Sequence, residues 1–116
     1  MVRTLKYKKK YANDILKLYC NELNIRGKEN DADQYGEIEE FLELKDIMLL
    51  DVNGRIKGYM IYKPHSLSNK SNVVNIPEIY IEKDYDTKSN YITLLNSVKK
   101  KLAFKFVPKT IYINKP

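Results

Sequence analysis

The sequence predicts a single mixed α/β domain whose elements follow the order β-α-α-β-β-β-α-β. Its 116 residues fall in the size range of one domain. The dipeptide Asn53-Gly54 joins two strand-like runs, and apolar residues from Tyr91 to Phe106 recur at helical spacing before a final strand-like run. Hydrophobic residues make up 43% and charged residues 31%, which is typical of a folded globular protein.

The first part of the chain predicts a strand and two helices. Val2–Tyr7 alternates as a short edge strand, and Asn13-Asp14 begins a helix that runs to about Leu23. A polar loop, Arg26–Gln34, precedes a second helix, Gly36–Leu44, whose early glutamates suit a helix N-terminus. The apolar face of the first helix is formed by residues at three- and four-residue spacing: Ile15, Leu18, Tyr19 and Leu23.

Cys20 is the only cysteine, and it lies among the apolar positions of the first helix. A single cysteine excludes an internal disulfide and disfavours a thiolate metal site, so we expect a buried structural thiol and no metal. A catalytic Cys–His pair is disfavoured because His65, the only histidine, lies in a polar loop.

The middle of the chain predicts an antiparallel hairpin. Asp46–Val52 and Arg55–Tyr62 are strand-like, and Asn-Gly between them supplies the positive φ angles that a two-residue turn requires. We interpret Pro64–Asn72, which is polar, as the connector to the next strand.

The last third predicts a strand, a long helix and a final strand. Val73–Glu82 is rich in β-branched residues, and Pro77 predicts a bulge because proline lacks an amide donor. After the polar loop Lys83–Ser89, a helix ends before Pro108, and Thr110–Asn114 forms a strand parallel to the preceding one through a right-handed crossover. The apolar positions of this helix are Tyr91, Leu94, Leu95, Val98, Leu102 and Phe106.

From Val2 to Asn114 these segments resemble the core of the GNAT (GCN5-related) N-acetyltransferases. Asp46–Tyr59 looks like that family's hairpin, including the small residue at Gly58, and Ile79–Leu95 resembles its cofactor strand, pyrophosphate loop and following helix. The resemblance implies a GNAT-like mixed sheet that lacks the family's final helix and last two strands.

The resemblance also implies an acetyl-CoA site at the strand–loop–helix segment. The family's loop usually reads Arg/Gln-x-x-Gly-x-Gly/Ala, whereas Asp86, Ser89 and Tyr91 stand at its three signature positions here. Glycine permits close approach of phosphate to backbone amides, and Asp86 has the wrong charge, so the cofactor motif is degenerate. The implied cofactor-binding residues are Tyr80, Ile81, Lys88, Ser89, Asn90 and Tyr91.

Glu78 is the candidate catalytic residue. In the family a carboxylate on or near the fourth strand often acts as the general base, and Glu78 matches that region beside the expected bulge. The alternative interpretation is an exposed strand glutamate. Tyr112 cannot take over the family's tyrosine general acid, which lies on an element absent here.

Two functions remain open for this chain. One is an acetyl-CoA-dependent N-acetyltransferase acting on an amine, and the other is a catalytically inactive GNAT-like binding or assembly module of viral or mobile-element origin. The unpaired edge of the Thr110–Asn114 strand predicts a homo-oligomer or a protein partner there.

Nucleic-acid binding is disfavoured despite a net charge of +6, because no aromatic-basic motif accompanies Lys8–Lys10 or Lys99–Lys101. No run is long enough to span a bilayer, and no signal-peptide pattern is present. We therefore expect a cytoplasmic protein, or one in the host cytoplasm if it is viral.

Overall fold

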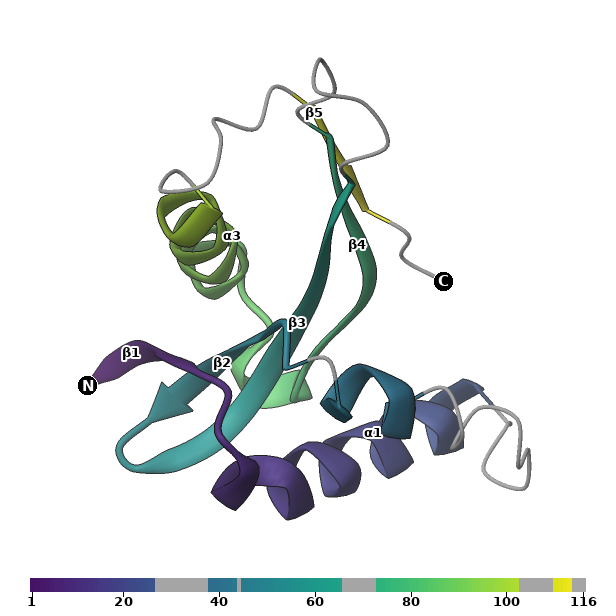
Figure 1. The fold of residues 1–116 in the computed structure, drawn as a ribbon. Helices are drawn as coiled ribbons and strands as arrows, with labels where there is room; N and C mark the ends of the chain where they lie inside the picture. The colour runs from purple at the N-terminus through teal and green to yellow at the C-terminus, as the bar shows by residue number, and fades with distance from the viewer. Residues whose placement is uncertain (27–37, 44, 66–72, 103–109, 114–116) are drawn as a thin grey trace.

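The computed structural model describes residues 1–26, 38–43, 45–65, 73–102 and 110–113 (Figure 1). Five strands are present: β1 (Val2–Lys6), β2 (Ile47–Val52), β3 (Arg55–His65), β4 (Val73–Ile81) and β5 (Thr110–Ile113). The helices are α1 (Ala12–Arg26), α3 (Lys88–Leu102) and a helical segment at residues 38–43. Two short 3-10 turns, η1 (Lys9–Tyr11) and η2 (Lys83–Tyr85), precede α1 and α3.

The strands form one sheet in the order β1-β2-β3-β4-β5. The first four strands are antiparallel neighbours, and β5 is parallel to β4. The expected parallel pairing of the last two strands is therefore confirmed, and β1 and β5 lie at the two edges. The expected oligomer or protein partner at the β5 edge stays a prediction.

Helices cover both faces of the sheet, with α3 on one side and α1 on the other (Figure 1). Alternation of side chains along each strand separates the apolar residues into two clusters. One cluster joins the sheet to α3 through Leu94, Val98 and Leu102. The other joins it to α1 and residues 38–43 through Ile15, Leu18, Tyr19, Ile38 and Phe41. The result is a three-layer α/β domain.

The hairpin between β2 and β3 is confirmed. Asn53 and Gly54 have φ angles of 53° and 88°, the positive values that the turn requires. Further along β3, Gly58 lies so close to β4 that a Cβ there would be 3.0 Å from both the Tyr80 carbonyl oxygen and Ile81 Cγ1. Glycine at this position thus allows β3 and β4 to approach closely at the C-terminal end of β4.

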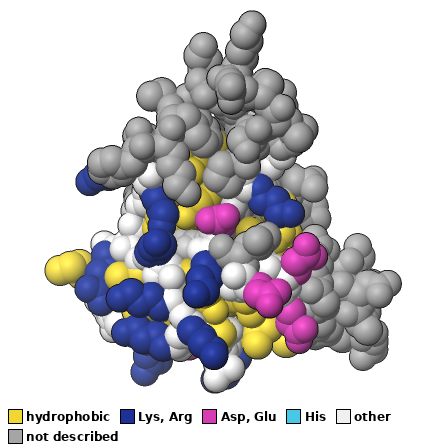
Figure 2. Space-filling view, viewed as in Figure 1, with side chains coloured by type: hydrophobic (Ala, Val, Ile, Leu, Met, Phe, Trp, Pro, Cys, Tyr) yellow, Lys and Arg dark blue, Asp and Glu magenta, His cyan; other side chains and the backbone are white. Residues whose placement is uncertain are grey.

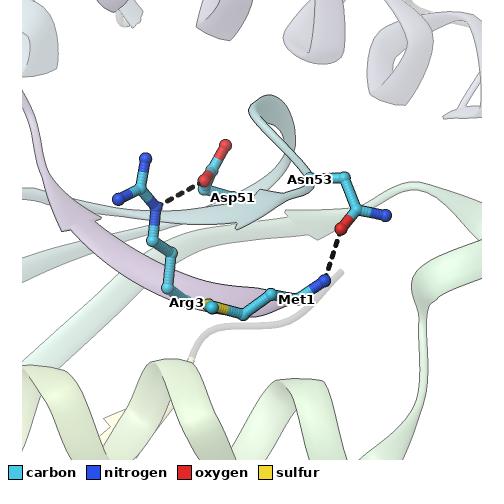
Figure 3. Close-up of polar contacts among 4 residues, drawn as sticks. All are labelled: Met1, Arg3, Asp51 and Asn53. Atoms are coloured by element: carbon cyan, nitrogen blue, oxygen red, sulfur yellow. Dashed lines mark hydrogen bonds and ion pairs between the residues drawn. The ribbon is translucent and has the colours of Figure 1, made fainter.

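Polar contacts join the edge strand β1 to β2, to the β2–β3 turn and to α3. Arg3 Nε donates a hydrogen bond of 2.7 Å to Asp51 Oδ2, and the N-terminal ammonium contacts Asn53 Oδ1 (Figure 3). On the opposite face, the Thr4 and Ser97 hydroxyls are 2.6 Å apart, which links β1 to α3.

The structure corrects several expectations. Cys20 is exposed rather than buried, because the buried stripe of α1 follows Ile15, Leu18 and Tyr19 and the next residue turns away from the sheet. The predicted connector begins later than expected, since Pro64 and His65 are still part of β3.

Other boundaries shift by a few residues. The loop predicted over 83–89 contains η2 and the first two residues of α3, and α1 continues to Arg26. Phe106, Pro108, Asn114 and most of the predicted 26–34 loop lie outside the described residues.

Within the described ranges, no helix combines the length and apolar character needed to cross a bilayer. The same part of the chain contains no cluster of three side chains suited to hold a metal ion.

Candidate functional site

The site begins at a β-bulge in the middle of β4. Ile61 of β3 pairs with Glu78 and Lys63 pairs with Asn75, so one β3 residue lies opposite both Ile76 and Pro77. This two-against-one arrangement is a β-bulge, which bends the strand and re-aims its side chains. The bulge expected near Pro77 is therefore confirmed.

The pairing of β4 with β5 ends at the same point. It runs from Val73↔Thr110 to Ile76↔Ile113, so Pro77–Ile81 has no strand on its β5 side within the described residues. An unpaired strand edge presents main-chain donors and acceptors. This second half of β4 can therefore bind an extended ligand that contains amide groups.

Glu78 lies on the unpaired half of β4, immediately after the bulge. Its side chain is 7% exposed, so the alternative of an exposed strand glutamate is wrong. Ile79 and Ile81 belong to the cluster on the α3 side, and strand alternation therefore directs Glu78 and Tyr80 to the α1 side. The site thus has a buried carboxylate on the same face as a tyrosine.

Tyr80 is half-buried against the α1-side cluster, with its ring centroid 6.3 Å from that of Tyr59. Burial raises the pKa of Tyr80, and the carboxylates of Glu22, Glu82 and Asp86 raise it further. The Tyr80 phenol is therefore protonated at neutral pH and can donate a hydrogen bond beside Glu78.

The turn after β4 is closed largely by its own main chain. The Glu82 amide donates to the Lys57 carbonyl at 2.8 Å, and the Tyr85 amide donates to the Glu82 carbonyl at 2.8 Å. Lys57 Nζ lies 3.1 Å from Glu82 Oε2 and 5.5 Å from the centre of the Tyr85 ring. These contacts fix the end of β4 against β3.

Thr87 caps the N-terminus of α3. Its hydroxyl accepts a hydrogen bond from the Asn90 amide at 3.1 Å, and its carbonyl accepts one from the Tyr91 amide at 3.0 Å. The Asn90 side-chain amide donates to the Tyr85 carbonyl at 2.8 Å. Of the described helix-start amides, those of Lys88 and Ser89 have no acceptor and can bind an anion.

A surface hollow of about 320 Å³ lies at this helix start, lined by Asp86, Thr87, Lys88 and Tyr91. Its charges oppose one another: the Asp86 carboxylate repels an anion, whereas the Lys88 ammonium and the helix dipole attract it. Tyr91 also packs against the α3-side core, so its ring is only partly available to the hollow.

The structure brings the sequence-predicted residues together as two adjoining groups. Glu78, Tyr80 and Ile81 lie on β4, with Ile81 buried in the α3-side core. Lys88, Ser89, Asn90 and Tyr91 form the first turn of α3. Sequence reasoning missed Thr87, although a threonine directly before an apolar helical pattern is a recognised capping signal.

No family model and no curated protein matches the sequence. Solved structures match the fold. A GNAT-family acetyltransferase from Staphylococcus aureus Mu50 has a TM-score of 0.77 at 15% identity, with 99% of this chain and 73% of that one covered. The ribosomal-protein-alanine N-acetyltransferase from Brucella melitensis biovar Abortus 2308 has a TM-score of 0.72 at 16% identity, with coverages of 100% and 81%.

AAC(6')-Iy, solved with the bisubstrate analogue CoA-S-monomethyl-acetylneamine, has a TM-score of 0.70 at 12% identity, with coverages of 100% and 80%. At these identities the similarity concerns the fold. The chain therefore has the GNAT acetyltransferase fold.

Proposed function

We propose that this chain is an acetyl-CoA-dependent N-acetyltransferase that acetylates an amine. The observation that carries the proposal is the unpaired half of β4, which starts at the bulge and leads to a helix start with two open amides. The similarity to solved acetyltransferases supports the same activity class.

The residues present fit acetyl-CoA, although with fewer amides than an uncapped helix start would offer. The amides of Lys88 and Ser89, with the Lys88 ammonium, would hold the pyrophosphate. The free edge of Pro77–Ile81 would bind the amide-containing arm of the cofactor. Acetyl-CoA supplies a thioester, whose carbonyl carbon is the electrophile for an amine.

Glu78 is the proposed general base. It would accept the proton that the attacking amine loses as its nitrogen bonds to the acetyl carbonyl carbon. The C–S bond of the thioester would break in the same transfer, and coenzyme A would leave as a thiolate that takes up a proton. Its place directly after the bulge puts it on the unpaired part of β4, and Tyr80 on the same face adds a neutral hydrogen-bond donor.

The second candidate is a catalytically inactive module with the same fold. It is favoured by the helix start, where the Thr87 hydroxyl occupies the amide of Asn90 and the Asp86 carboxylate adds a negative charge. Such a protein would use its surface for binding or assembly and would not respond to the cofactor.

A thermal-shift titration with acetyl-CoA tests the proposal. Ligand at 100 times its dissociation constant should add roughly 2.7 kcal/mol to the free energy of unfolding. Absence of any shift at millimolar cofactor would remove the enzyme proposal and leave the inactive module.

A matched pair of variants at Lys88 tests the binding site. Lys88→Ala removes the ammonium and keeps the amide, whereas Lys88→Pro removes both and remains compatible with the first position of a helix. We expect weaker acetyl-CoA binding in both variants and the larger loss in Lys88→Pro. Equal affinity in all three proteins would exclude the α3 start as the pyrophosphate site.

Glu78→Gln tests the chemistry. This variant should bind acetyl-CoA like the original chain but transfer its acetyl group at least 100-fold more slowly to a panel of amines. Products are best measured by mass spectrometry, because Cys20 is exposed and would react with thiol reagents. An unchanged rate would show that Glu78 is not the base.

A further inference from the structure

The turn between β2 and β3 places an asparagine directly before a glycine. Asn53 is the only asparagine of the chain that glycine follows, and both turn residues are exposed. A Cβ at Gly54 would have no neighbouring atom within 4 Å, so no other part of the described chain crowds this residue. The side-chain amide carbon of Asn53 is therefore open to attack by the main-chain nitrogen of the next residue, which glycine leaves unhindered.

Hydrogen bonding at the turn favours this attack. The main-chain amide of Gly54 has no acceptor among the described residues, so its proton is not held within the sheet. The main-chain amide of Asn53 donates to the Met1 carbonyl at 3.1 Å, and its Oδ1 accepts a hydrogen bond from the N-terminal ammonium (Figure 3). A cationic donor on Oδ1 stabilises the negative charge that develops there when a nucleophile adds to Cγ.

Positive charge around the turn favours loss of the Gly54 amide proton. Arg55 directly follows the turn and is exposed, and Arg3 on the neighbouring strand is 61% exposed although it pairs with Asp51. Figure 2 shows basic side chains gathered on the lower left of this face, where β1 and the β2–β3 hairpin lie in Figure 1. Nearby cations stabilise an amide anion and attract hydroxide, so the reactive form of this nitrogen is more accessible than in a neutral environment.

We propose that Asn53 is a site of spontaneous deamidation, which converts it to aspartate or isoaspartate. The Gly54 amide gives its proton to hydroxide, and its nitrogen then bonds to the Cγ atom of Asn53. The bond from Cγ to Nδ2 breaks, and Nδ2 takes up a proton from water and leaves as ammonia. Water then opens the resulting cyclic imide at one of its two carbonyl carbons, and the choice of carbon decides between aspartate and isoaspartate.

The two products affect the fold differently. Aspartate retains the turn, because Asp-Gly also accepts the positive φ angles of 53° and 88°, and its carboxylate would face the Met1 ammonium. Isoaspartate adds one carbon atom to the main chain, so the turn no longer fits the pairing of Val52 with Arg55. Deamidation thus yields one form that keeps its hairpin and another that loses the end of the β2–β3 ladder.

Peptide mapping by mass spectrometry tests the proposal on the folded chain in mildly alkaline buffer. Asn90 is the internal control, because its side-chain amide donates to the Tyr85 carbonyl and a tyrosine follows it. We expect Asn53 to lose ammonia at least about tenfold faster than Asn90, at a rate that rises with hydroxide concentration. Equal rates at the two asparagines, or no product at Asn53, would overturn the proposal.

Gly54→Asn is the matched variant, because asparagine tolerates the positive φ of this position and its Cβ has room. Its side chain hinders attack by the main-chain nitrogen to which it is attached. Ammonia loss at Asn53 should therefore be at least about tenfold slower than in the original chain. An unchanged rate would show that this nitrogen is not the nucleophile.

The two products can also be compared by thermal unfolding. Both carry one additional negative charge, so ion exchange separates them from the original chain. The isoaspartate form should unfold at a lower temperature than the original chain, whereas Asn53→Asp should unfold at nearly the same temperature. An isoaspartate form as stable as Asn53→Asp would contradict the predicted loss at the end of the β2–β3 ladder.

Discussion

Replacing Gly58 with alanine should destabilise the fold where the proposed cofactor strand meets β3. The new Cβ would lie 3.0 Å from the Tyr80 carbonyl oxygen, 3.0 Å from Ile81 Cγ1 and 3.2 Å from Ile81 Cα. Two of these three atoms are backbone, so rotation of the Ile81 side chain cannot remove the clash. Overpacking of this kind costs about 1–3 kcal/mol.

A smaller effect of opposite sign accompanies the clash. Alanine reduces the entropy of the unfolded chain, which stabilises by about 0.4–1 kcal/mol where the backbone angles suit it. We therefore expect a net loss of about 1–2 kcal/mol, which for a chain of this size lowers Tm by roughly 4 °C per kcal/mol. Urea unfolding followed by circular dichroism is the suitable assay, because the chain has no tryptophan.

Two comparisons sharpen the test. A Cβ at Gly54 would have no neighbouring atom within 4 Å, and asparagine tolerates the positive φ of this turn position. Gly54→Asn should therefore lower the free energy of unfolding by less than about 1 kcal/mol. Ile81→Ala alone should cost about 2–5 kcal/mol, because Ile81 is a buried core residue. Gly58→Ala should still destabilise the Ile81→Ala protein, because the contacts with the Tyr80 carbonyl oxygen and Ile81 Cα persist. A Gly58→Ala protein as stable as the original, or no added loss from Gly58→Ala in the Ile81→Ala protein, would refute the steric reasoning.

Three further predictions concern the α3-side core. Tyr62 is 1% exposed, and its hydroxyl has no hydrogen-bond partner among the described residues. Tyr62→Phe should therefore raise the free energy of unfolding by about 1 kcal/mol. A loss of stability in this variant would show that the hydroxyl has a partner. Burial, and to a lesser degree the Asp46 carboxylate, raises the pKa of Tyr62 to about 12. The neutral phenol should therefore contribute fully to the free energy of unfolding below about pH 10, and this contribution should be lost between about pH 10 and 12. Measured by urea unfolding, the free energy of unfolding should fall less steeply between about pH 10 and 12 in Tyr62→Phe than in the original chain. An identical fall in both proteins would contradict the raised pKa of Tyr62. Leu94 is fully buried on α3, so Leu94→Ala should lower the free energy of unfolding by about 2–5 kcal/mol. Ile92 is 41% exposed on the same helix, so Ile92→Ala should lower it far less. Similar losses in the two variants would refute the assigned orientation of α3.

Local signals in the sequence were sufficient to predict most of the architecture. Asn53-Gly54 adopts the positive φ angles that its turn requires, and the irregularity at Pro77 lies where a missing amide donor predicts it. Both features depend on the conformational limits of one or two residues, so neighbours distant in the chain do not change them. The periodicity of α3 similarly placed Leu94, Val98 and Leu102 in the core.

Features that depend on three-dimensional neighbours were harder to predict. Cys20 is exposed because its angular position on α1 falls just outside the buried stripe, a difference that apolar composition alone does not resolve. Glu78 is buried by parts of the chain that pack over this segment of β4, and a glutamate in a strand-like run does not itself indicate that packing. The occupation of the Asn90 amide by the Thr87 hydroxyl depends on where α3 begins, and boundary positions are the least certain part of any sequence-based assignment.

The coincidence of the bulge with the last β4–β5 pair has a thermodynamic consequence for any ligand that lies along the strand. Past Ile76 the direction of β4 changes, and the ladder with β5 does not continue among the described residues. A ligand that binds there would therefore replace water, and not a neighbouring strand, at the main-chain groups of β4. Its binding would break no hydrogen bond between strands of the sheet.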